Sequence, residues 1–368
     1  MNDTDIDEAV NLKAVYNEQS RLMLPDLGFW DVITLLDCLS QSRNRPLTSF
    51  DTLQYTMPVY NINPELFSGL QNQVVVLTGG AHGVGESVVT TLYSVGAHVV
   101  FGDIDKTACV HLIQKLSEGH PLSTGSLAFR RVDVRNYEDN LGLFQDAFSR
   151  HGRVDHAMSI AGVTEGQNWF DPSLDLASIT APPSTSVLDI NLVGALYFAR
   201  VAAVYLLQGV DSGRDKSLML TGSLASFKEQ PGLYVYQPAK HGVLGLFRAI
   251  RRNLASRGIR INILCPGLIS TAMSTKIQHI WEENKLPINT ANQVGDYALS
   301  LITKGQEKDG SIRTGLAIYV EGGKGWEFES ELDRLDEEWM GAEMARNCVE
   351  INRVLGVGAA WTTERPKI

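Results

Sequence analysis

The sequence predicts an α/β fold in which buried parallel strands alternate with helices. Short runs of apolar, mostly β-branched residues recur through the middle of the chain, as buried strands do. The first run, residues 74–77, leads into a glycine-rich turn and then into apolar residues at helical spacing. Farther on, Tyr236 and Lys240 stand four residues apart, on one face of a predicted helix. In such a fold, ligands bind at the carboxyl ends of the strands.

The glycine-rich turn covers residues 78–85, with the sequence TGGAHGVG. Glycine lets the backbone turn sharply and approach a pyrophosphate, and the following helix N-terminus offers free N–H groups. An ordinary strand–helix turn can have the same pattern, so the turn alone does not establish a dinucleotide site. The residues expected to bind a cofactor here are Gly79, His82, Gly83, Val84 and Gly85.

The next predicted strand, residues 97–102, ends at Asp103, which is 18 residues beyond Gly85. An acidic residue at this place can accept hydrogen bonds from the adenosine ribose and would repel a 2′-phosphate. Ile104 follows it, and no Lys or Arg comes before Lys106. We therefore expect NAD rather than NADP, although a cation at His82 would favour a phosphate and an Asp at a strand end is common.

Two further short strands are predicted at residues 128–132 and 156–160. The first leads to Asp133 and Val134, and the second to Ala161 and Gly162. Either pair can flank the adenine of a dinucleotide, or can simply end its strand.

The residues suited to chemistry follow in order. Ser223 lies just past a buried strand at residues 218–221, and Tyr236 and Lys240 lie beyond it. A tyrosine hydroxyl has an ordinary pKa of about 10, and a neighbouring ammonium group together with a cationic nicotinamide ring would lower that pKa by favouring phenolate. Tyr236 is thus the expected general acid/base, with Ser223 donating to the substrate oxygen. Asn191 is expected to bend a helix and to hold a water that links Lys240 to solvent. Tyr and Lys four apart are common by accident, and only their combination with Ser223 and the turn points to this role.

Together these pieces resemble the short-chain dehydrogenase/reductase family over residues 71–325, and most closely a subgroup found in fungal secondary metabolism. The resemblance implies a Rossmann-type doubly wound parallel sheet with helices on both faces. It also implies a nicotinamide cofactor, a homodimer or homotetramer, and a catalytic tetrad. That tetrad consists of Asn191, Ser223, Tyr236 and Lys240. Further cofactor contacts are implied at Pro266, Gly267, Ile269 and Thr271.

Two departures from the family pattern stand out. The family's Asn-Asn-Ala-Gly is replaced by residues 159–162, Ser-Ile-Ala-Gly, which affects the bracing of the sheet more than the chemistry. Pro238 lies between Tyr236 and Lys240. Because proline is tolerated in the first turn of a helix, we expect that helix to begin near Tyr236.

Three parts are expected along the chain. Residues 1–70 form a helical N-terminal extension, with ordered helices within 6–37 and a linker at 40–51. Residues 71–325 form the catalytic domain. Residues 326–368 form a tail of one or two helices near the substrate mouth.

Composition limits the function. The net charge of −10 lies in the flanks, with −6 in residues 1–70 and −5 in residues 321–368, and the middle is close to neutral. No basic stripe indicates nucleic acid, and no long apolar run predicts a membrane span. The N-terminus lacks a signal-like core, and the four cysteines lack metal-ligand spacing, so we expect a soluble, cytoplasmic protein with reduced thiols and no metal.

The expected substrate is a bulky apolar alcohol or ketone of terpenoid or polyketide type. Aromatic and aliphatic residues in segments 163–186 and 268–293 would line its site. Two functions remain open. One is an NAD-dependent interconversion of a secondary alcohol and a ketone. The other is a non-redox cyclase or isomerase that retains the cofactor site, because fold does not fix function.

Overall fold

The computed structural model describes residues 57–304 and 312–356 of the 368-residue chain. The chain divides into two units, and the boundary lies between Thr56 and Met57. The helices expected within residues 6–37 and the linker at 40–51 lie outside the described residues.

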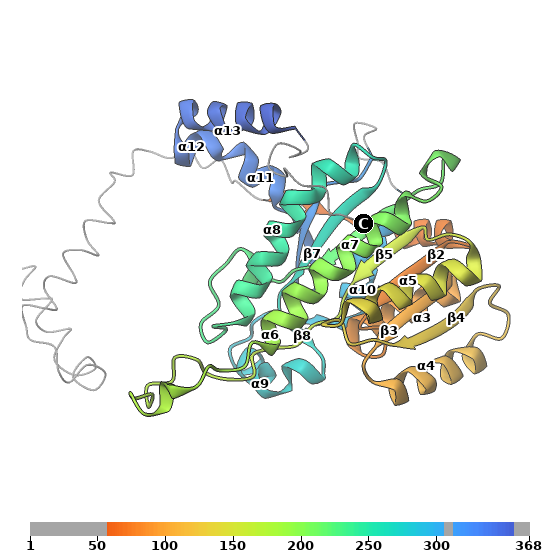
Figure 1. Cartoon of the computed structure of the whole chain (residues 1–368), viewed down its shortest axis with the longest axis horizontal. Coiled ribbons are helices and arrows are strands. Elements are labelled where there is room, and N and C mark those ends of the chain that lie inside the picture. The colour runs from red at the N-terminus through yellow and green to blue at the C-terminus, as the bar shows by residue number, and fades with distance from the viewer. Residues whose placement is uncertain (1–56, 305–311, 357–368) are drawn as a thin grey trace, which may run out of the picture. The chain divides into compact units, whose positions relative to one another are not determined.

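The described chain forms one sheet of nine strands with helices on both faces, as expected (Figure 1). The strand order is β1-β11-β10-β7-β6-β5-β2-β3-β4. The seven strands from β10 to β4 pair in parallel, and the chain reverses its direction of winding between β2 and β5. The strand bounds are β1 Val59–Tyr60, β2 Val74–Thr78, β3 His98–Asp103, β4 Ser126–Arg131, β5 His156–Ser159, β6 Ser217–Thr221, β7 Arg260–Pro266, β10 Ala317–Glu321 and β11 Lys324–Glu327.

The inner parallel strands, such as β2, are buried on both faces, which is why they read as continuous apolar runs, whereas the edge strand β4 is only partly buried. In β2, Val74 and Val76 belong to one apolar core, whereas Val75 and Leu77 belong to a second core on the other face. This alternation follows from the two-residue period of a strand. The sheet therefore separates two independent cores.

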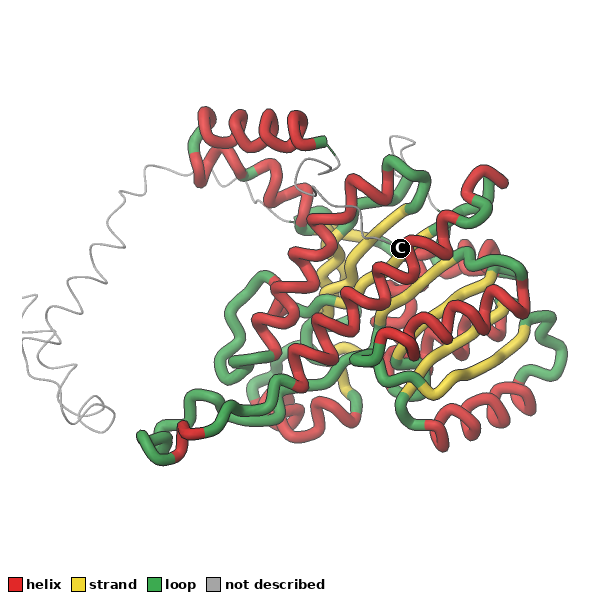
Figure 2. The backbone as a smooth tube through the Cα atoms, in the orientation of Figure 1, coloured by secondary structure: helices red, strands yellow, loops and turns green. Residues whose placement is uncertain are grey.

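Helices pack their apolar faces onto these two cores. They are the red coils on either side of the yellow strands in Figure 2. Residues of α5, α7 and α8 contribute to the first core, and residues of α3, α4 and α10 to the second. The bounds are α3 Gly83–Ser94, α4 Lys106–Gly119, α5 Tyr137–His151, α6 Ser186–Leu188, α7 Gly194–Leu207, α8 Tyr236–Ala255, α9 Thr275–Glu283 and α10 Ala291–Ile302.

Short elements complete the region around the carboxyl ends of the strands. A small two-stranded sheet pairs β8 Ile269–Ser270 with β9 Asn289–Thr290. A π-helical turn joins α6 to α7. The bounds of the helical turns are η2 Pro64–Leu70, η3 Ser178–Thr180, η4 Asp189–Val193, which is the π-helical turn, η5 Val210–Ser212, η6 Leu224–Ser226 and η7 Ala272–Ser274.

Residues 57–70, which the sequence places in the N-terminal extension, lie on the edge of the main sheet. Val59 and Tyr60 pair antiparallel with β11, and Phe67 and Leu70 of η2 are buried in the second core. The domain boundary at residue 70 remains a prediction, but these residues share the core of the sheet.

One stretch of the described chain, Ser186–Leu207, is long and apolar enough to cross a membrane by length and composition. Its mean hydropathy is 1.7. The same residues form α6, η4 and α7, and α7 lies against α5, β5 and β6. Phe198 and Leu206 are fully buried there. An apolar core helix accounts for this composition.

The C-terminal part of the described chain is helical, with three helices where one or two were expected. They are α11 Glu329–Arg334, α12 Asp336–Met340 and α13 Ala342–Leu355. Glu329 of α11 binds Arg248 at 2.8 Å and Arg251 at 3.0 Å. Both arginines lie on α8, about 18 Å or more along its axis from Tyr236. The expected position of residues 326–368 near the substrate mouth remains a prediction, and residues 357–368 lie outside the described part of the chain.

Candidate active site

The candidate site begins where the winding of the sheet reverses. At this point the carboxyl ends of β2 and β5 lie side by side, with Thr78 opposite Ser159. A Cβ added to Gly79 would lie 2.7 Å from the backbone of Ala161. The two predicted cofactor segments therefore meet at the crevice where open α/β sheets bind ligands.

Close contacts between backbone atoms require glycine in the turn after β2. A Cβ on Gly85 would stand only 1.8 Å from the carbonyl oxygen of Gly79, so no side chain fits without moving the turn. Gly83 has a φ of +53° and faces the methyl group of Thr271 at a distance of 3.2 Å from the added Cβ. The turn thus packs closely on itself and beside Thr271, and Val84 follows in the first turn of α3.

Asp103 ends β3 and ties the glycine-rich turn to the next loop. Its Oδ2 accepts the N–H of Ala81 at 3.0 Å, and its Oδ1 accepts the N–H of Asp105 at 3.0 Å. His82 lies 3.1 Å from Asp105, and Ile104 between the two acids is exposed. Both carboxylate oxygens of Asp103 keep a lone pair for another donor.

The side chains of Ser223, Tyr236 and Lys240 meet at the end of β6. The helix α8 begins at Tyr236, as Pro238 predicts. Nζ of Lys240 lies 5.6 Å from the centre of the Tyr236 ring and donates to the carbonyl oxygen of Thr221 at 2.9 Å. Ser223 caps the turn η6, where its Oγ accepts the N–H of Ala225 at 3.2 Å. Its side chain also makes a hydrogen bond with the hydroxyl of Tyr236.

Burial controls the charge of these groups. Burial raises the pKa of the Tyr236 hydroxyl, and the hydrogen bond with Ser223 acts in the opposite direction. Burial also lowers the pKa of Lys240 to about 8. The sequence predicts a lowered tyrosine pKa from the neighbouring ammonium group. In the structure, the pKa of Tyr236 shifts the other way because loss of solvent around the phenolate is the larger effect.

Asn191 lies in the π-helical turn η4 and is 2% exposed. Its Oδ1 accepts the N–H of Val163 at 2.8 Å, and its Nδ2 donates to the carbonyl oxygen of the same residue at 2.8 Å. A Cβ on Gly162 would lie 3.1 Å from Asn191 Oδ1 and 3.8 Å from Lys240 Nζ. Asn191 therefore fixes the loop after β5 beside the lysine, and the water that it was expected to hold remains a prediction.

The loop after β7 forms the other side of the site. Pro266 ends β7, and the N–H of Gly267 donates to the carbonyl oxygen of Val320 at 2.8 Å. Ile269 belongs to β8, and Thr271 caps the turn η7 together with Ser274. This arrangement holds Thr271 beside Gly83.

The residues predicted to flank adenine follow β4. Val134 is buried, and Asp133 makes a 2.6 Å ion pair with Arg135 that holds the pKa of its carboxyl group below the ordinary value. The Asp133 carboxylate is thus engaged on its own loop.

Glu165 is a residue of this region that the sequence did not reveal. It lies in the loop after β5, and its Oε2 accepts the N–H groups of Val235 at 3.0 Å and Tyr236 at 2.8 Å. Its Oε1 is buried and has no hydrogen-bond partner. A glutamate in a loop carries no periodic signal, so only the fold could reveal this contact with the first turn of α8.

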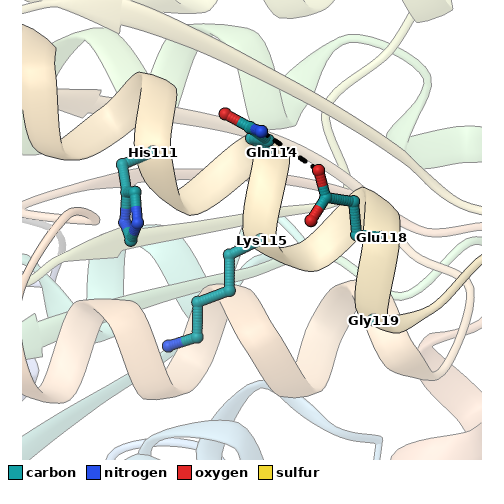
Figure 3. A pocket seen from close by; sticks show the side chains of 5 residues that line it. All are labelled: His111, Gln114, Lys115, Glu118 and Gly119. Carbon is teal, nitrogen blue, oxygen red and sulfur yellow. Dashed lines mark hydrogen bonds between the residues drawn. The ribbon is translucent and has the colours of Figure 1, made fainter.

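Two open hollows mark the surface of the described chain. One lies on α4, where the side chains of its lining residues project from a single helix (Figure 3). It contains none of the predicted site residues. The other has a volume of about 330 Å³ and adjoins Tyr236 through Glu165. Its lining residues are Glu165, Gly166, Gln167, Asn168, Gly232 and Tyr234.

The residues present fit a nicotinamide dinucleotide. The backbone at Gly79 and Gly85 packs so closely on its neighbours that no side chain fits there, and the turn leads directly into the N-terminus of α3, whose free N–H groups suit a pyrophosphate. Asp103 offers oxygen acceptors at one end. Lys240 offers a buried ammonium donor at the other.

Comparison with known proteins agrees with this geometry. A family model described as short chain dehydrogenase matches residues 73–280. The chain is 30% identical to 5′-hydroxyaverantin dehydrogenase of Dothistroma septosporum over 236 residues, which are 61% of this chain and 75% of that protein. It is 30% identical to the short-chain dehydrogenase/reductase ascJ of Acremonium egyptiacum over 206 residues, which are 55% of this chain and 66% of that protein.

Solved structures share the fold. The 3-ketoacyl-(acyl-carrier-protein) reductase from Brucella melitensis, complexed with NADH, matches with a TM-score of 0.58 and 22% identity. Levodione reductase matches with a TM-score of 0.58 and 22% identity. Each match covers 69% of this chain and 98% of the other.

Proposed function

The chain belongs to the short-chain dehydrogenase family, and from this we propose that it is an NAD(H)-dependent oxidoreductase that interconverts a secondary alcohol and a ketone. The observation that carries the proposal is the meeting of Tyr236, Lys240 and Ser223 beside the crevice at Gly79. One end of the crevice suits a dinucleotide, and the other holds groups that move a proton.

We assign the proton transfer to the hydroxyl of Tyr236. When bound, the nicotinamide would supply or accept the hydride. Tyr236 gives its proton to the carbonyl oxygen during reduction and takes a proton from the alcohol during oxidation. Because burial raises the pKa of this hydroxyl, its protonated form prevails at neutral pH, and reduction begins from that form.

The neighbours of Tyr236 have separate tasks in this proposal. The hydroxyl of Ser223 donates to the same substrate oxygen and stabilises its developing charge. The ammonium of Lys240 favours phenolate when Tyr236 has lost its proton, and its position suits a contact with the nicotinamide ribose. Asn191 holds the loop after β5 in place beside Lys240.

The preference for NAD over NADP rests on Asp103. Its two oxygens lie at the end of β3, where an adenosine ribose would present its hydroxyl groups. The carboxylate would accept from those hydroxyl groups and repel a 2′-phosphate.

The proposed substrate is a bulky apolar metabolite of terpenoid or polyketide type. The aromatic rings of Phe170 and Tyr234 pack edge to face beside the hollow next to Tyr236, with their ring centres 5.1 Å apart. Met273 of η7 and Ile277 and Ile280 of α9, which follow β7 in the chain, are exposed. One similar protein is named a dehydrogenase of 5′-hydroxyaverantin. Exposed aromatic and aliphatic side chains beside a proton-transfer group favour such a ligand.

We also propose a homodimer or homotetramer in the cytoplasm. Leu196 and Val204 of α7 are exposed apolar residues on the outside of the first core. Cys109, Cys265 and Cys348 are free thiols in the described chain, which suits a reducing compartment.

The test is a spectrophotometric assay of the purified full chain. NAD with a panel of apolar secondary alcohols, and NADH with the matching ketones, should change absorbance in the NADH band. Product formation with no net change in NADH would instead favour a cyclase or isomerase that retains the cofactor site.

A further inference from the structure

We propose that Asp105, through its contact with His82, is a second determinant of cofactor choice that disfavours a 2′-phosphate at the adenosine end of the site. This inference rests on the proposed NAD(H)-dependent function. Nε2 of His82 lies 3.1 Å from Oδ2 of Asp105. The two residues belong to the loops after β2 and β3, which are adjacent parallel strands.

Three contacts hold these loops, two of them between the loops and one, from Asp105 to Asp103, within the loop after β3. The N–H of Ala81 donates to Oδ2 of Asp103, and the N–H of Asp105 donates to its Oδ1, both at 3.0 Å. The third contact is the pair of His82 and Asp105. The imidazole is therefore held against Asp105, on the side of the loop where α4 begins.

This position determines what His82 can offer to a ligand. A protonated imidazole is the cation in the glycine-rich turn that a 2′-phosphate would need. Asp105 occupies its Nε2 and adds a second negative charge two residues from Asp103. A phosphate monoester carries about −1.5 to −2 charges at neutral pH, so both acids would repel it. A ribose hydroxyl is neutral and does not meet this repulsion.

The contact between His82 and Asp105 contributes little to the stability of the fold. The His82 side chain is 64% exposed, and that of Asp105 is 44% exposed. Ion pairs that exposed contribute little to stability, because water and salt screen them. Its position at the cofactor end of the sheet therefore accords better with a role in binding.

Asp105 also has a structural role, which the test must preserve. Its Oδ1 accepts the N–H of Ala108 at 3.0 Å and caps the N-terminus of α4. Asparagine and serine cap helices as well as aspartate does. Asp105→Asn and Asp105→Ser thus remove the charge and keep the cap.

The experiment measures binding, without turnover. NADH and NADPH are titrated into the full chain, and the fluorescence of the reduced nicotinamide gives each Kd. We expect Asp105→Asn and Asp105→Ser to tighten NADPH binding by about tenfold and to leave NADH within about twofold. The gain should shrink at high salt, because charges at an exposed site are screened.

The role of His82 is tested by a double-mutant cycle. His82→Ala alone should change the NADPH Kd by less than about twofold, since Asp105 already occupies the ring. In the Asp105→Asn background, the same change should remove most of the gain. Asp171→Asn is the matched control: Asp171 is a partly exposed acid in the loop after β5 whose Oδ1 accepts the N–H of Ser173. It should leave both Kd values unchanged.

An unchanged ratio of NADPH to NADH affinity in both Asp105 variants would overturn the inference. A gain that His82→Ala leaves wholly intact would overturn the role of the pair, because repulsion by the Asp105 charge alone would then account for it. Failure of the wild-type chain to bind either dinucleotide would overturn the proposed function itself, and the role of the pair with it.

Discussion

At the scale of single residues, burial and charge act against one another around Tyr236. Burial raises the pKa of the tyrosine and lowers the pKa of Lys240 to about 8, so both groups are shifted toward their neutral forms. Lys240 keeps one firm partner, the carbonyl oxygen of Thr221 at 2.9 Å. The ammonium is thus fixed in place, close to the ring whose ionisation it can assist.

Replacing Lys240 tests its two proposed tasks, which are to favour the phenolate of Tyr236 and to contact the nicotinamide ribose. Lys240→Met keeps much of the buried stem and removes the ammonium. We expect weaker NADH binding together with a loss of turnover of about 10²-fold or more, because both the ribose contact and the support of phenolate are lost. Fluorescence titration and steady-state kinetics measure the two effects. Unchanged NADH affinity would remove the ribose contact from the account.

At the scale of elements, the site depends on close approaches between turns. The glycine-rich turn closes on itself at Gly79 and Gly85, and Gly83 faces Thr271 from the loop after β7. On the other side, Glu165 joins the loop after β5 to the first turn of α8. Segments far apart in the sequence are thereby fixed to one another around the crevice.

Gly85→Ala should abolish dinucleotide binding. The new methyl group would lie 1.8 Å from the carbonyl oxygen of Gly79, so the turn must move away from its present path. Gly119→Ala is the control, because a Cβ there would have no heavy atom within 4 Å. NADH titration of both variants checks this. Normal NADH affinity in Gly85→Ala would argue against the turn as the cofactor cradle.

Glu165→Ala should reduce turnover while leaving NADH affinity unchanged. Its carboxylate accepts two N–H groups at the start of α8, so its loss frees the backbone of Tyr236 and removes about 1 kcal/mol of stability. Glu165→Gln keeps an acceptor oxygen and should restore most of the turnover. Kinetics and chemical unfolding of both variants are the measurements. Equal turnover in all three proteins would leave Glu165 with no role in positioning Tyr236.

At the scale of the whole molecule, opposite ends of the sheet have different characters. The candidate site lies at the carboxyl ends of the strands. Charged residues are buried near the amino ends, where Lys216 binds Asp155 at 3.0 Å and Arg260 binds Asp215 at 2.6 Å. His156 lies among them, 1% exposed, with its Nδ1 at 2.8 Å from Ser217 Oγ. The charged residues at the amino ends of the strands therefore bear on the stability of the fold and not on the candidate site.

Stability should fall as the pH drops from about 6.5 to about 4. Burial lowers the pKa of His156 from 6.5 to about 4. Within this pH window the histidine therefore binds a proton in the unfolded chain but not in the folded chain. The free energy of unfolding should lose about 3 kcal/mol from this group. His156→Gln should flatten the slope, whereas the exposed His111→Gln should not. Urea unfolding across this range measures the slopes, and equal slopes in all three proteins would contradict the assignment.

The sequence predicted the fold class and the strands β2 to β6, because buried parallel strands leave apolar runs and glycine leaves a fixed pattern. It could not reveal Glu165 or the pair of His82 and Asp105, since these contacts appear only when loops from different strands come together. It also predicted the wrong direction for the pKa of Tyr236, because burial cannot be read from a neighbouring charge. The two-residue edge strand β1 is too short to leave a pattern.

The central claim is that Tyr236 transfers the proton in an NAD(H)-dependent reaction. The most direct test compares wild type and Tyr236→Phe in ketone reduction, with the NADH Kd measured in parallel. The account predicts a fall in turnover of about 10²–10⁴-fold, because the hydroxyl proton is gone, and an unchanged NADH Kd, because the ring shape remains. Near-normal turnover in Tyr236→Phe would contradict the account.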